Sequence, residues 1–193
     1  MAFERGFKTR CENLAATVRK ELSQSNAAPL SVADLASHLG VQLIEPREIP
    51  GLSEKALSAL LRTDCDDWSA LTIGEGSSGA LIVYNPTHSP ARQASDLAHE
   101  IAHLLLRHTP STMMFSPDGS WTLRTFNPQQ EDEANWLAGC LLLPRAALES
   151  VLRQGRDDEA IATDYGVSLQ MVRYRKGVTG VNRQYGRRGA SRR

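Results

Sequence analysis

The sequence of 193 residues lacks any long uninterrupted run of apolar residues and has only three cysteines. A membrane-spanning helix needs about 20 consecutive apolar residues, and the first residues, Met-Ala-Phe-Glu-Arg, contain no signal-like apolar block. Cys11, Cys65 and Cys140 are odd in number and widely spaced, which disfavours a disulfide framework and a paired cysteine metal motif. We therefore expect a globular, cytoplasmic protein that does not contact a membrane.

The sequence also lacks a net charge, because 22 basic residues balance 22 acidic ones, but the two kinds are unevenly distributed. Residues 165–193 contain eight Lys or Arg and no acid, which leaves a net charge of −8 on residues 1–164. The end of the chain has too little apolar content to fold alone, so residues 179–193 are predicted to be a disordered basic tail. Such a tail either attracts nucleic acid or an acidic partner, or only aids solubility.

Hydrophobic periodicity predicts a mixture of helices and short strands. Apolar residues at three- and four-residue intervals indicate an amphipathic helix over residues 3–22. Further helices are expected over 31–40, 53–62 and 90–108, and strands over 41–44, 68–73 and 80–84. The glycine-rich loop between the last two strands is followed by neither a lysine nor a helix, which excludes a phosphate-binding loop. We expect an α+β fold in which a small sheet packs against the 90–108 helix.

The most informative motif lies within that helix, in the run His99-Glu100-Ile101-Ala102-His103. Four residues make slightly more than one helical turn, so the two imidazoles lie roughly 40° apart on one face and can reach the same metal ion. Glu100 lies roughly a quarter of a turn away, which suits a general base beside the metal rather than a ligand. The flanking residues are apolar, so these polar groups would be buried and would need partners.

Two histidines leave a catalytic zinc site one protein ligand short. The extended three-histidine pattern would place Gly at position 106 and His at position 109, but these residues are Leu106 and Thr109. That class of enzyme is excluded. A carboxylate on a second helix is the other common solution, and the run over 131–143, stopped by Pro144, has helical spacing.

This second helix begins with an acidic trio that offers two candidate ligands. Glu131 is favoured because Asn135 lies on the same face, where its amide could hold a metal-bound histidine by the other ring nitrogen. Glu133 lies on a different face and is the alternative ligand. Acidic residues in the first turn are also favourable with the helix dipole without any metal.

Three segments together resemble the ImmA/IrrE-type metallopeptidases, a gluzincin-like family: the histidine motif, residues 131–135, and Leu141-Leu142-Leu143-Pro144. The resemblance covers roughly residues 30–176. It implies a zinc-dependent endopeptidase that cleaves helix-turn-helix repressors and so relieves repression. By this resemblance, zinc is bound by His99, His103 and Glu131, and Glu100 is the general base.

Peptide hydrolysis also requires a donor to the tetrahedral oxyanion. The nearby candidates are Tyr84, His88, Arg92 and His108. A substrate backbone could be held by strand addition to residues 68–73 or 80–84. The long loop over 109–127 could act as a lid that faces the substrate.

A DNA-binding transcriptional regulator is the competing class of function. Residues 159–175 have the alanine, glycine and valine spacing of a helix-turn-helix. Arg173, Arg175 and Lys176 lie on or after its second helix, where they could contact DNA. A zinc-binding protein that docks without cleaving is a third possibility.

The chain is therefore expected to have four parts. These are an N-terminal amphipathic helix (1–28), a zinc metallopeptidase domain (29–154), a helix-turn-helix-like segment (155–178) and a basic tail (179–193).

Overall fold

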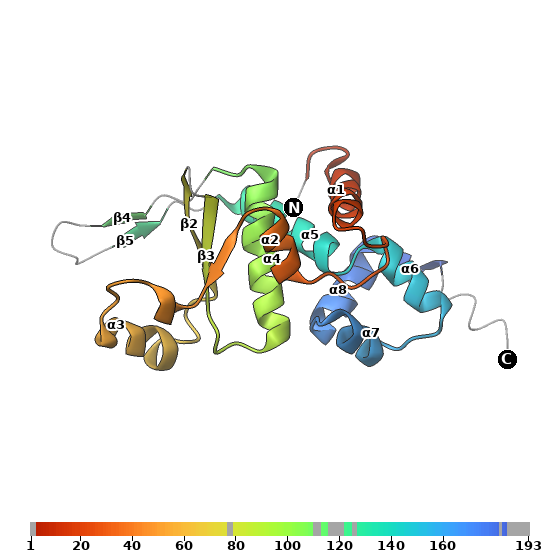
Figure 1. Cartoon of the computed structure of the whole chain (residues 1–193). Helices are drawn as coiled ribbons and strands as arrows, with labels where there is room; N and C mark the ends of the chain where they lie inside the picture. Colours follow the sequence, from red (N-terminus) through yellow and green to blue (C-terminus); the bar gives the residue numbers. More distant parts are fainter. Residues whose placement is uncertain are drawn as a thin grey trace.

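A computed structural model of the chain describes residues 3–76, 79–109, 113–115, 122–124, 127–181 and 183–184 (Figure 1). The helices are α1 (Phe7–Glu21), α2 (Val32–His38), α3 (Glu54–Ser58), α4 (Pro90–Leu106), α5 (Pro128–Leu142), α6 (Arg145–Arg153), α7 (Asp158–Tyr165) and α8 (Leu169–Thr179). The strands are β1 (Gln42–Ile44), β2 (Ala70–Gly76), β3 (Gly79–Tyr84), β4 (Met113–Phe115) and β5 (Thr122–Arg124). The predicted α+β class is confirmed.

Local sequence signals explain where several helices begin and end. The Ser31 side chain accepts a hydrogen bond from the Asp34 amide at 3.2 Å, as expected of an N-cap before α2. The helix predicted over 53–62 is shorter, because α3 ends at Ser58 and the chain continues as a π-helical turn over Ala59–Thr63. Pro144 separates α5 from α6, because its conformation is extended.

The small sheet has three strands in the order β1–β3–β2. Strand β1 runs parallel to β3, with Leu43 opposite Ile82, and β2 runs antiparallel to β3, with Thr72 opposite Ile82. Because β3 is paired on both sides, the prediction that residues 80–84 could receive a substrate strand is wrong. Among the described residues β2 is an edge strand, and on its outer side the Thr72 amide donates to a side chain of α4 rather than to another strand.

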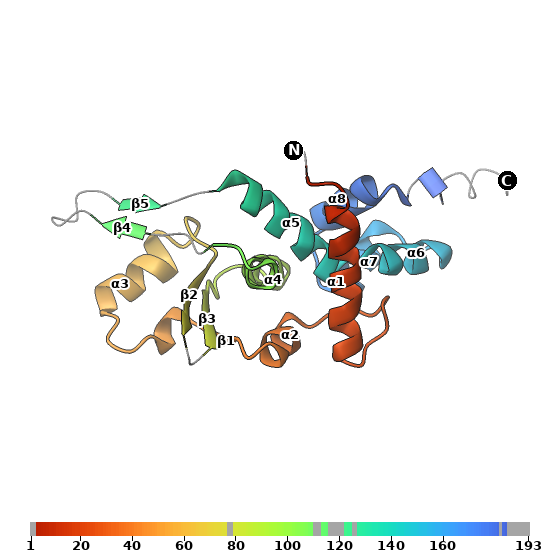
Figure 2. The same ribbon diagram turned by 90° about the horizontal axis from the view of Figure 1, so that it is seen from above.

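Helix α4 packs on this sheet and on α5. Figure 2 views α4 along its axis, with the sheet on one side and α1 and the end of α5 on the other. Of the apolar residues that flank the histidines, Leu97, Ala98, Ile101 and Ala102 are buried, whereas Leu104 and Leu105 are partly buried. The polar groups of the motif, which the sequence predicted to be buried, are also only partly buried. Helix α5 is buried along most of its length and packs against both α4 and α1. The core therefore fixes the position of α4 relative to α5.

Two fully buried arginines hold the C-terminal end of α5. The Arg19 guanidinium, from α1, donates to the Leu141 carbonyl at 2.6 Å, and the Arg175 Nε atom, from α8, donates to the Leu143 carbonyl at 3.0 Å. These donors satisfy carbonyls that a helix end leaves without intrahelical partners. Burial lowers the pKa of Arg19 to about 10, so this residue stays charged at neutral pH.

The helix-turn-helix-like segment is formed by α7 and α8. Gly166 has a φ of 62° at the turn, and the Ser168 side chain caps α8. The prediction that Arg175 could contact DNA is wrong, because Arg175 points into the core and forms an ion pair with Glu12 at 2.6 Å. A buried cation next to a backbone carbonyl of α5 is a structural anchor.

Two sequence-based predictions fall mostly outside the described residues. Of the predicted lid, β4 and β5 are described, and they pair antiparallel as a ribbon beyond β2 (Figures 1 and 2). Of the predicted basic tail, only residues 179–181, 183 and 184 are described. Within the described parts of the chain, no helix is both long and apolar enough to cross a membrane.

Candidate metal centre

The packing of α4 against α5 brings together the three predicted metal ligands. The His99 Nε2 atom lies 3.2 Å from Glu131 Oε2 and 3.1 Å from His103 Nε2, and His103 Nε2 lies 3.7 Å from the same Glu131 oxygen. Each of the three side chains is about one-fifth exposed. Two nitrogens and one carboxylate oxygen thus converge at a point that solvent and substrate can reach.

The spacing of these atoms suits a zinc ion. Three tetrahedral ligands at about 2.1 Å from one ion are separated by about 3.4 Å from one another. The observed separations of 3.1, 3.2 and 3.7 Å lie around that value. Two imidazoles and a glutamate are also a typical protein ligand set of catalytic zinc, with a further position for water or substrate.

Asn135 lies where the sequence predicted it, one turn after Glu131 on α5. Its Oδ1 atom is 3.0 Å from His99 Nδ1. When His99 carries its proton on Nδ1, this contact is a hydrogen bond that leaves Nε2 unprotonated and directed at the metal.

Glu133, the alternative ligand, is not part of the group of described side chains that could hold a metal ion. Its Oε2 atom instead lies 3.3 Å from His108 Nε2, and its Oε1 atom accepts a hydrogen bond from the Gln129 side chain at 2.9 Å. The structure therefore favours Glu131 as the third ligand.

Glu100 contacts the edge strand of the sheet. Its Oε2 atom accepts one hydrogen bond from the Thr72 backbone amide at 3.1 Å and a second from the Thr72 hydroxyl at 2.6 Å. Glu100 follows His99 directly on α4, so its carboxylate is held between the ligand group and β2. Thr72 was not identified from the sequence, because only the packing of α4 on the sheet brings it to Glu100.

The four candidate oxyanion donors have other partners. The Tyr84 hydroxyl donates to Glu45 at 3.2 Å, and burial, reinforced by Glu45, raises the pKa of Tyr84. His88 is buried with its Nδ1 atom 3.1 Å from Asp96, and Arg92 lies 3.9 Å from the same carboxylate.

The fourth candidate, His108, contacts His103 and Glu133. All four side chains thus have described contacts with other residues of the protein.

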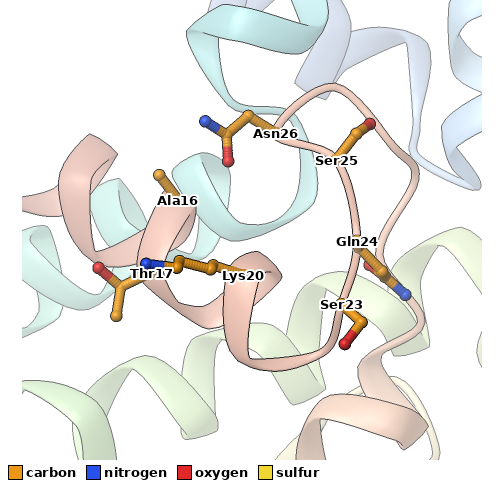
Figure 3. A pocket seen from close by; sticks show the side chains of 7 residues that line it. All are labelled: Ala16, Thr17, Lys20, Ser23, Gln24, Ser25 and Asn26. Atoms are coloured by element: carbon orange, nitrogen blue, oxygen red, sulfur yellow. The ribbon is translucent and has the colours of Figure 1, made fainter.

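A separate hollow of about 550 Å³ lies at the end of α1 (Figure 3). It is open to solvent and is lined by Ala16, Thr17, Lys20, Ser23, Gln24, Ser25 and Asn26. This lining contains no histidine, cysteine or carboxylate. The group on α4 and α5 is therefore the better candidate for catalysis.

An HExxH helix that meets a glutamate from a second helix defines the class of metal-dependent peptidases. Residues 37–176 match the family described as IrrE N-terminal-like domain. The chain therefore belongs to the ImmA/IrrE metallopeptidase family, and His99, His103 and Glu131 are its metal-binding triad.

One solved structure, a Mycobacterium tuberculosis transcriptional regulator, has a similar fold with a TM-score of 0.52. The two sequences are 13% identical, and the match covers 86% of this chain and 46% of that protein. At this identity the likeness concerns the fold alone, and this chain spans less than half of that protein's length. No curated protein matches the chain.

Proposed function

We propose that the protein is a zinc-dependent endopeptidase whose substrate is a helix-turn-helix transcriptional repressor. The proposed zinc-peptidase activity is supported by the convergence of the His99, His103 and Glu131 ligand atoms, next to Glu100. The repressor as substrate is supported by the family resemblance, and the reaction would relieve repression.

The ligand set would hold zinc through Nε2 of both histidines and one oxygen of Glu131. When bound, zinc would act as a Lewis acid that activates water and polarises the scissile carbonyl. Glu100 acts as the general base that takes a proton from the attacking water and delivers it to the leaving amine. The two hydrogen bonds from Thr72 keep the Glu100 carboxylate in position before substrate binds.

The geometry of β2 suits an extended polypeptide substrate. This strand is an edge of the sheet, and its Thr72 amide points at Glu100 rather than at β3. A substrate strand added along this edge would pass directly beside the metal centre. The exposed Leu71 and Ile73 side chains of the same strand would then lie next to apolar substrate residues.

The test uses the purified full chain, one equivalent of zinc and candidate helix-turn-helix repressors, taken first from any that are encoded beside its gene. The wild-type protein is expected to cut the repressor, and Glu100→Gln is expected to bind zinc equally well but to lose cleavage. Mass spectrometry identifies the products, and elemental analysis measures the bound metal. A Glu100→Gln protein that cleaves at the wild-type rate would overturn the proposed mechanism.

The cleavage experiment and a DNA-binding assay on the same purified protein distinguish the two other functions. A protein that binds zinc but never cuts the repressor would act by docking. A DNA-binding protein would bind duplex DNA with an affinity that falls steeply with added salt. Two of the three basic residues proposed to contact DNA already have partners within the protein. Arg175 is buried and pairs with Glu12, and Lys176 lies 2.6 Å from Asp158.

A further inference from the structure

We propose that His108 and Glu133 form a positioning chain that fixes the orientation of the metal ligand His103. This inference rests on the proposed zinc-dependent function, because its purpose is to hold a metal ligand. From the sequence, His108 was a candidate oxyanion donor and Glu133 an alternative metal ligand. The positioning chain gives both residues a different role.

Consecutive short contacts carry the proposal. The Nδ1 atoms of His103 and His108 are 3.0 Å apart, and His108 Nε2 lies 3.3 Å from Glu133 Oε2. The Gln129 side chain donates to the other Glu133 oxygen at 2.9 Å. Only 6% of the His108 side chain and 16% of the Glu133 side chain are exposed. The His108 and Glu133 side chains of this positioning chain are therefore shielded from competing water.

One arrangement of protons satisfies the His103–His108 and His108–Glu133 contacts together when His103 binds a metal. His103 must offer a lone pair at Nε2, so its proton is on Nδ1 and is donated to His108 Nδ1. His108 then carries its own proton on Nε2 and donates it to the Glu133 carboxylate. The carboxylate thereby fixes the tautomers of both imidazoles, and His103 Nε2 stays directed at the ligand group.

The backbone is shaped to bring His108 to this position. Helix α4 ends at Leu106, and Arg107 adopts the left-handed conformation with a φ of 55°, which is unfavourable for a residue with a side chain. This turn lets the His108 amide donate to the His103 carbonyl at 3.0 Å. His108 thus folds back over the residue that its side chain supports. A strained residue beside a functional site is consistent with such a role.

The two histidine ligands are supported in different ways. His99 is held by a single amide, Asn135, which is exposed to solvent. His103 is held instead by His108 and, through it, by Glu133, and both of these side chains are mostly buried. Because Glu133 and Glu131 both lie on α5, one helix supplies the third ligand and also supports the second histidine.

The proposal is tested by measuring the zinc affinity of the full chain with a chromophoric chelator as competitor. His108→Ala is expected to weaken zinc binding by about 10- to 100-fold, as for other residues that orient metal ligands. His108→Asn should recover most of this loss, because its Oδ1 atom can accept the proton of His103 Nδ1. His108→Phe fills the same space without an acceptor and should not recover it.

A second set of variants tests the carboxylate. Glu133→Ala should weaken zinc binding, whereas Asp132→Ala, which removes the neighbouring acid of α5, should not. Thermal unfolding of the zinc-free proteins identifies any variant that fails to fold, and the absorption spectrum of bound Co²⁺ reports the ligand geometry independently of peptidase activity.

Equal zinc affinity of the wild-type and His108→Ala proteins would overturn the positioning chain, as would recovery by Phe as complete as by Asn. If the wild-type chain itself bound no zinc, the proposed function would fail first, and the positioning chain with it. Loss of cleavage with unchanged zinc affinity in Glu100→Gln leaves the positioning chain intact. The two proposals can thus be refuted separately.

Discussion

Replacing Arg175 with alanine is expected to destabilise the fold without affecting a DNA-binding surface. The guanidinium is fully buried, donates to the Leu143 carbonyl at 3.0 Å and pairs with Glu12 at 2.6 Å. Removal of one partner of a buried ion pair costs about 3–5 kcal/mol. Glu12 is 26% exposed and keeps a hydrogen bond from the Arg145 amide at 3.0 Å, so the lower end of that range applies. The expected loss is about 3 kcal/mol of unfolding free energy.

Thermal and urea unfolding of the Arg175→Ala protein measure this loss. At about 2–4 °C per kcal/mol for a chain of this size, the Tm should fall by about 6–12 °C. Arg173→Ala is the matched control, because Arg173 is exposed on the same helix and lies 3.8 Å from Asp158, and it should change stability by less than about 0.5 kcal/mol. If both variants unfolded at the wild-type temperature and Arg175→Ala lost affinity for duplex DNA, the structural role of Arg175 would be refuted.

Two further predictions concern other parts of the chain. Thr72→Val removes the hydroxyl that lies 2.6 Å from Glu100. Hydrogen bonds to charged groups contribute about 1.5–3 kcal/mol, so this variant should lower kcat/KM for repressor cleavage by about 10- to 150-fold, whereas Thr72→Ser should retain activity. Equal activity of the two Thr72 variants would show that the hydroxyl does not position Glu100. Burial raises the pKa of Cys11 to about 12 and also raises that of Cys140, so in the folded protein at pH 8 a thiol reagent should react quickly with Cys65 alone, and with all three cysteines after denaturation. Three equally fast reactions in the native state would contradict this assignment.

The parts of the site that follow from helical periodicity could be predicted from the sequence. The spacing of His99 and His103, and that of Glu131 and Asn135, depends only on the number of residues per turn. Apolar flanks showed that both helices are buried, and buried polar groups require partners. These local arguments were enough to select residues that the structure brings within hydrogen-bonding distance of one another.

Contacts that depend on the path of the chain between helices could not be predicted. His108 was predicted only as a candidate oxyanion donor, because nothing in the sequence requires Arg107 to adopt the left-handed conformation that turns His108 back towards His103. Thr72 meets Glu100 only through the packing of α4 on the sheet. Arg175 was a candidate DNA contact because it lies on the second helix of the helix-turn-helix-like segment. Its buried partners could not be predicted, since they lie 32 and 163 residues away in the sequence.

The two buried arginines at the end of α5 have a consequence for how the protein can be dissected. The same helix carries Glu131 in its first turn and is anchored at its last carbonyls by α1 and α8. A fragment that ends after α6 would retain every metal ligand in its sequence, yet it would lack the anchor supplied by Arg175. The smallest unit that folds stably therefore extends beyond the metal ligands, and a fragment that ends at the α6–α7 junction should be a poor substitute for the full chain.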